Sequence, residues 1–116
     1  MKVSNLKINF ELVNGLILIK GMINDEEGYL LVDTGASKTV IDSEYFSDLG
    51  KLETEEKAII FNQGIQDVIV CQTKVNRIEI EGLVISDYLV RILDLSYFSN
   101  FFGNHKIIGV LGLDVL

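Results

Sequence analysis

Asp33 is the residue of this chain that is best placed to do chemistry. It follows the apolar run Leu30–Val32 and comes directly before Thr34 and Gly35. A carboxylate at the end of a buried strand is costly to ionise unless hydrogen-bond donors surround it. Thr34 and Ser37 carry hydroxyl donors, and Gly35 lacks the Cβ that would keep neighbouring backbone N–H groups away. The spacing therefore predicts an aspartate that is held in position for acid–base chemistry.

A β-hairpin is the element expected to position this aspartate. Two apolar runs, Leu16–Ile23 and Tyr29–Val32, flank the polar segment Asn24–Gly28. Apolar runs around a short polar segment that ends in glycine are typical of two strands joined by a turn. The acidic residues 25–27 of that turn are interpreted as solvent-exposed, because no histidine or spaced set of metal ligands accompanies them. The second strand would deliver Asp33 at its end.

Beyond the aspartate, the pattern predicts a helix and a second hairpin. Asp42 and Ser43 are suited to cap a short helix over residues 44–49. The charged segment 51–57 is expected to be exposed. Ala58–Val70 holds two apolar runs around a polar turn that contains glycine, which predicts a hairpin.

The C-terminal half is predicted to be mostly strands. Thr73–Ile80 alternates apolar and charged residues, with Asn76 as a bulge or break in the alternation. Leu83–Ile85 and Tyr88–Leu93 are predicted to be further strands. The aromatic residues within Leu95–Phe102 are interpreted as core, buried by a loose helical turn.

The composition is that of a single folded domain. The chain has 116 residues, of which 48% are hydrophobic; this is enough for a core but leaves no room for a second domain. No apolar run approaches the roughly 18 residues of a membrane span. The net charge of −7 argues against a nucleic-acid partner, because phosphates require a basic surface. The start of the sequence lacks the apolar stretch of a signal peptide, so a cytoplasmic location is expected unless a longer natural chain carries a targeting segment.

Cys71 and His105 are the other residues with reactive side chains. Cys71 is the single cysteine, which excludes an internal disulfide and suits a reducing compartment. It is interpreted as a small apolar residue on a buried strand, since no base is indicated beside it. His105 is the single histidine and is expected at the surface. Ser–His, Cys–His and histidine-based zinc chemistry are therefore disfavoured, and no metal or cofactor is expected.

Two motifs carry a resemblance to a known family. Leu31–Ser37 is similar to the active-site motif of the retropepsin-like (retroviral-type) aspartic proteases. Val110–Asp114 resembles the apolar-apolar-glycine segment that closes the second loop in that family, and its glycine follows Asp33 by 79 residues. Val90–Leu95 resembles the preceding strand in bacterial, single-domain members. The likeness covers most of the chain.

This resemblance implies an all-β chain: one lobe of the closed, barrel-like acid-protease fold with one short helix, formed by residues 1–116 as a single domain. It implies an aspartic endopeptidase that works as a C2 homodimer, in which each protomer supplies one Asp33. In such a pair, two nearby carboxylates share a proton and activate a water, the behaviour for which aspartic proteases are the standard example. The other implied partner is an extended peptide, bound by strand addition and cleaved between apolar side chains.

The resemblance also implies roles for residues around Asp33. The active-site loop would be supported by Thr34, Gly35, Ala36 and Ser37, with Thr34 bonding across the dimer axis and Gly35 lying against substrate backbone. The flap, a hairpin that folds over substrate, would present Gln63, Gly64 and Ile65. The second loop would contain Leu111 and Gly112, with Asp114 as a support outside the catalytic pair.

An alternative function stays open at this stage. The predicted hairpin is poorer in glycine than family flaps, and the sequence ends at Leu116, where family members usually run on into a helix; either this is a short variant or the natural chain is longer. Both features favour a non-catalytic retropepsin-like module for peptide binding or dimerisation. The intact Asp33 motif favours the protease, because a binding module needs no carboxylate at a two-fold axis. Phosphoryl transfer is disfavoured, since no phosphate-cradling glycine loop accompanies Asp33.

Overall fold

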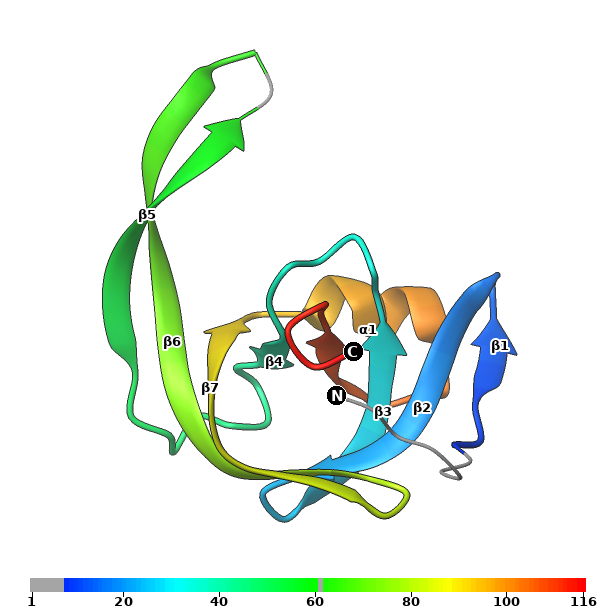
Figure 1. Ribbon diagram of the computed structural model, residues 1–116. Coiled ribbons are helices and arrows are strands. Elements are labelled where there is room, and N and C mark those ends of the chain that lie inside the picture. Colours follow the sequence, from blue (N-terminus) through cyan, green and yellow to red (C-terminus); the bar gives the residue numbers. More distant parts are fainter. Residues whose placement is uncertain (1–7, 61) are drawn as a thin grey trace.

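The computed structural model describes residues 8–60 and 62–116. Within these residues it is nearly all β, with strands joined into one sheet and a short helix, as the sequence predicts (Figure 1). The elements are β1 (Glu11–Val13), β2 (Leu16–Ile23), β3 (Glu26–Val32), β4 (Val40–Asp42), β5 (Leu52–Ile60), β6 (Gly64–Ile80), β7 (Leu83–Leu93), α1 (Ser96–Phe102) and β8 (Ile107–Leu111). In the described part of the chain, no helix is long and apolar enough to cross a membrane.

The sheet places the end of β3 beside the end of β8. Its strand order is β1-β2-β3-β8-β4-β7-β6-β5, and β2 also pairs with β6. β3 and β8 run parallel, with Val32 opposite Leu111. The residues that follow these strands, Asp33 and Gly112, therefore start two loops from one edge of the sheet. The closed barrel stays a prediction.

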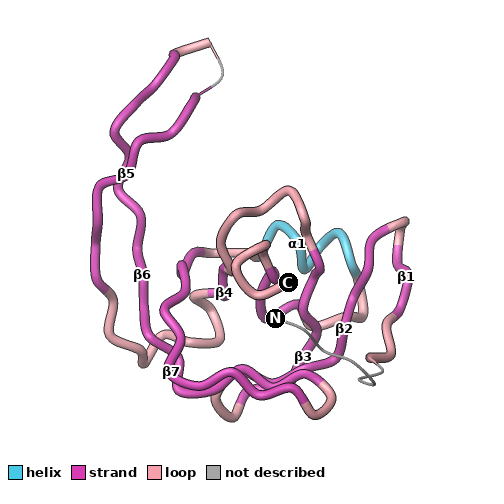
Figure 2. The backbone as a smooth tube through the Cα atoms, in the orientation of Figure 1, coloured by secondary structure: helices cyan, strands magenta, loops and turns pink. Residues whose placement is uncertain are grey.

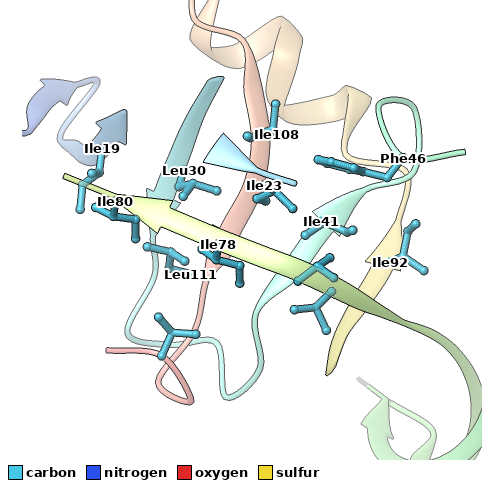
Figure 3. Packing of buried hydrophobic residues seen from close by; sticks show 13 residues of the cluster. Ile19, Ile23, Leu30, Ile41, Phe46, Ile78, Ile80, Ile92, Ile108 and Leu111 are labelled. Carbon is cyan, nitrogen blue, oxygen red and sulfur yellow. The ribbon is translucent and has the colours of Figure 1, made fainter. Parts of the chain in front are cut away.

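Near Asp33, the strand β3 is buried on both faces, at Leu30 and Leu31. On one face Leu30 joins the main hydrophobic cluster, which Figure 3 shows assembled from β2, β3, β4, β6, β7 and β8. On the other face Leu31 packs in a second cluster that includes Phe102 of α1. β8, its parallel neighbour, is buried along its whole length. A strand packed from both sides is a rigid support for the residue at its end.

The helix predicted over residues 44–49 is wrong, because this segment forms turns. Asp42 does act as a local cap, since its Oδ1 accepts the N–H of Glu44 at 3.0 Å. The same oxygen also accepts the N–H of Leu95 at 3.2 Å, which ties the segment to the junction between β7 and α1. Six residues are too few for a helix to be stable without favourable packing, and the side chain of Asp42 offers backbone amides an alternative hydrogen-bond acceptor.

The second predicted hairpin is confirmed and is longer than expected. β5 begins at Leu52, so most of the charged segment 51–57 is strand, paired with β6 from Leu52–Gln72 to Ile60–Gly64. Figures 1 and 2 show this hairpin as an arm that rises past β7 and bends toward the side where the loop 33–39 lies. Charged side chains are tolerated there because the arm projects from the core. Phe61, part of this prediction, lies outside the described residues.

The break predicted at Asn76 is confirmed, although no residue is inserted. Val75 and Ile78 are both buried, at 0% and 1% exposure, so the inward-facing positions change from odd to even across Asn76. The register of β6 against β7 is the same on both sides. The change occurs opposite Asp87, which has a positive φ of 51°. The two strands predicted after residue 82 are one continuous strand, β7.

The aromatic segment at 95–102 is helical as predicted, but only part of it is core. Phe102 is buried, whereas Tyr97 and Phe101 are exposed. The side chain of Phe98 lies outside the described part of the structure. A single helix lying on a sheet buries one stripe of its surface, which explains why neighbouring aromatics differ in exposure.

Candidate active site

Asp33 stands at the solvent-facing end of β3. Its N–H donates to the carbonyl of Leu111 at 3.1 Å, which fixes its backbone to β8. Its Oδ1 accepts the N–H of Gly35 at 2.9 Å, and the side chain is exposed. The donor to the carboxylate is thus a backbone amide. The hydroxyls of Thr34 and Ser37, expected to donate, make no such bond among the described residues, and both residues are exposed.

Gly35 occupies a position where a side chain would crowd the carboxylate. A Cβ built at this residue would lie 3.1 Å from Oδ1 of Asp33, closer than ordinary van der Waals contact. The loop then turns back, with the N–H of Ala36 donating to the carbonyl of Asp33 at 3.2 Å. Glycine therefore lets the amide at 35 approach the carboxylate, as the sequence predicts.

The second loop packs against the first without a gap. The N–H of Leu113 donates to the carbonyl of Ala36 at 2.8 Å. A Cβ on Gly112 would lie 2.6 to 2.9 Å from the backbone C, O and N of Lys38. Gly112 is therefore required for close approach of the two loops, while Leu111 is buried as the last residue of β8.

A buried hydrogen-bond network holds the two loops together. Thr39 is fully buried; its Oγ1 donates to Oδ1 of Asp114 at 2.8 Å and accepts the N–H of Gly112 at 3.1 Å. Tyr88 of β7 donates its hydroxyl to Oδ2 of Asp114 at 3.0 Å. Burial, and then the hydrogen bond to Asp114, raises the pKa of Tyr88. Asp114 therefore lies where the resemblance implied, in the support of the loop.

Thr39 and Tyr88 were missed by the sequence reasoning. Thr39 comes directly before the apolar pair Val40–Ile41, Tyr88 begins a run of mostly apolar residues, and a buried polar side chain must find a partner. A polar residue beside apolar ones marks such a position in the sequence but does not identify its partner. The shared partner, Asp114, lies 75 residues from Thr39 and 26 from Tyr88.

The predicted flap residues lie at the tip of the β5–β6 arm. Gln63, Gly64 and Ile65 are exposed. The turn uses positive φ angles at Asn62 (66°) and Gly64 (74°). The side-chain amide of Gln66 donates to the carbonyl of Gln63 at 2.9 Å and fastens the turn from within. Among the described residues, no hydrogen bond joins the tip to Asp33.

Cys71 and His105, the other residues with reactive side chains, are both partly buried. Cys71 is half-buried on β6 rather than fully buried. His105 is also half-buried, and its ring packs edge-on against Tyr29 at a centroid distance of 4.8 Å. Its Nε2 lies 3.6 Å from Oε2 of Glu11. The expectation of a surface histidine is therefore only partly right, because the ring packs between α1, β1 and β3.

Comparisons with known proteins agree with this geometry. The structure is similar to a crystal structure of a retropepsin-like aspartic protease from Rickettsia conorii, with a TM-score of 0.54 and 19% sequence identity. The match covers 96% of this chain and 82% of that one. At this identity the likeness establishes the fold, which is retropepsin-like. No curated protein matches the chain.

The family is established by a second comparison. Residues 19–115 match the model of the aspartyl protease family. The chain therefore belongs to the aspartyl protease family, and the resemblance read from its two motifs is confirmed. Family and fold support a function of the protease type.

Proposed function

We propose that the protein is an aspartic endopeptidase, active as a C2 homodimer that pairs the Asp33 carboxylates of two protomers. The observation that carries the proposal is the exposure of Asp33 on a rigid strand end, with one carboxylate oxygen held by Gly35. A general acid–base group must be fixed in position and open to substrate. One chain supplies a single such aspartate from its one Asp-Thr-Gly motif, and an isologous interface would bring the same residue of a second copy to the axis.

The proposed mechanism follows from the proximity of like charges. Two carboxylates a few ångströms apart do not both ionise, so one keeps a proton. The ionised Asp33 takes a proton from water, and the protonated one donates a hydrogen bond to the scissile carbonyl. The backbone amide of Gly35 keeps one oxygen of each carboxylate oriented during this exchange.

The β5–β6 arm is the proposed flap. It is a long hairpin whose exposed tip, Gln63–Ile65, projects on the side of the molecule that carries the loop 33–39 (Figure 1). Closure of such a hairpin over an extended peptide would add strand hydrogen bonds and exclude water.

The direct test is cleavage of an unfolded protein from pH 4 to 7 by the wild-type chain and by Asp33→Asn. The proposal expects fragments from the wild type and none from the variant. Equal cleavage by both would show a contaminant. No cleavage by a wild-type chain shown to be dimeric would overturn the proposal.

One observation favours the alternative of a non-catalytic peptide-binding or dimerisation module. The arm is fastened by its own side chains, through the Gln66–Gln63 bond and an ion pair of 2.9 Å between Lys57 and Asp67. These bonds lie within the hairpin, and among the described residues none joins its tip to Asp33, which is what a structural hairpin without a lid role would show. Peptide binding that is equally tight in wild type and Asp33→Asn, without cleavage in either, would support this alternative.

A further inference from the structure

A small cavity of about 220 Å³ lies beside the active-site loop. Its lining includes Lys38 from the end of that loop, Gln72 of β6 and Arg91 of β7. Pockets for cofactors and other small molecules usually measure about 300–1,000 Å³. This cavity is therefore too small for such a ligand and suits a single side chain.

Lys38 is the cation in this cavity that no salt bridge of the described residues includes. Its side chain is exposed. The guanidinium of Arg91, in contrast, is paired with Glu56, with 2.6 Å between Nη2 and Oε1. Asp114 also lines the cavity, but both of its carboxylate oxygens accept hydrogen bonds from buried or half-buried hydroxyls. The ammonium of Lys38 is thus open to a ligand, whereas the oxygens of Asp114 are already engaged by hydroxyl donors.

Chain geometry keeps this cation close to the catalytic position. Lys38 follows Asp33 by five residues, so their Cα atoms lie within about 17 Å of each other. An extended peptide covers that distance in about five residues. The backbone of Lys38 cannot drift away, because it packs directly on Gly112. A peptide centred on Asp33 that extends toward Lys38 would therefore reach this residue within about five residues of the scissile bond.

We propose that this cavity is a specificity subsite for a glutamate or aspartate side chain of the substrate, with Lys38 as the residue that selects the carboxylate. The inference rests on the proposed peptidase function. A charge-assisted hydrogen bond to the ammonium would favour a carboxylate over the isosteric amide. The net charge of −7 repels acidic peptides as a whole, so the preference is confined to the substrate position that reaches Lys38.

The test uses octapeptides with an apolar pair at the centre and Glu, Gln or Lys placed at each other position in turn. At low salt, one position should give a kcat/KM about fivefold higher for Glu than for Gln, the size expected of a partly exposed ion pair. Lys38→Gln should reduce that ratio to about one, and Lys38→Glu should favour the Lys peptide. Lys51→Gln is the matched control, because Lys51 is also exposed and outside the salt bridges of the described residues. It should keep the wild-type ratio.

Two results would overturn the subsite: equal rates for Glu and Gln at every position, or a Glu preference that survives Lys38→Gln. If the wild type cleaves none of the peptides, the proposed function fails separately. The subsite is then judged by fluorescence anisotropy with the same peptides labelled. A Glu preference in binding that Lys38→Gln abolishes would support it, and equal binding of the Glu and Gln peptides would reject it.

Discussion

Replacing Gly112 by alanine should destabilise the protein, whereas the same replacement at Gly50 should not. At Gly112 the new methyl group would meet three backbone atoms of Lys38 at 2.6, 2.7 and 2.9 Å. Backbone atoms cannot rotate away as a side chain can, so the two loops must separate. Inserting a methyl group into a packed site usually costs about 1–3 kcal/mol, and the backbone contact places Gly112→Ala at about 3 kcal/mol.

Gly50 is the matched control for this experiment. A Cβ there would have no neighbour within 4 Å, and its φ is not positive. Gly50→Ala should therefore leave stability unchanged or raise it by about 0.4–1 kcal/mol, because alanine restricts the unfolded chain. Both variants are compared with wild type by urea denaturation at one protein concentration, since dimerisation would make stability depend on concentration. A free energy of unfolding for Gly112→Ala within about 0.5 kcal/mol of wild type would refute the close packing of the two loops.

Three further predictions concern the residues that support the site. Tyr88→Phe removes the hydroxyl that donates to Asp114 and should lower the free energy of unfolding by about 1–3 kcal/mol in urea; no loss would contradict the network. Because burial and Asp114 raise the pKa of Tyr88 in the folded state above 10.0, stability present below pH 10 should be lost as pH rises through the folded pKa. Urea denaturation at several pH values from 9 to 11 should show that Tyr88→Phe loses less free energy of unfolding than the wild type as pH rises. Equal losses in both proteins would show that Tyr88 is not the cause of the pH dependence. Asp42→Ala removes the acceptor for two backbone amides and should cost about 2–4 kcal/mol, whereas the exposed Asp48→Ala should stay within about 0.5 kcal/mol; similar effects of the two would contradict the cap.

The features that could be predicted from sequence depend on local patterns. The apolar runs on either side of Asn24 predict the β2–β3 hairpin, and a strand that ends in Asp33 follows directly. The alternation of apolar and charged residues across 73–80 also predicts that the buried positions of β6 shift by one residue at Asn76. In these segments neighbouring residues specify the structure, so a single sequence is enough.

The features that were missed depend on contacts between distant segments. Asp42 is read from sequence as a helix cap, but its bond to Leu95 crosses 53 residues and favours turns. The network of Thr39, Tyr88 and Asp114 joins three separate segments, so no spacing in the sequence predicts it. Likewise, the Asp33 motif predicts the loop that follows β3, while the cavity beside this loop depends on β6 and β7, which contribute Gln72 and Arg91 to its lining.

The most direct test of the central claim is a subunit-mixing experiment with wild type and Asp33→Asn. The two chains are unfolded together in equal amounts and refolded, and cleavage of an unfolded protein is measured at constant total protein. If each active site needs one Asp33 from each of two protomers, only wild-type pairs are active, and random pairing gives about a quarter of the wild-type rate. A rate of about one half would show that each Asp33 acts without a partner and would contradict the account.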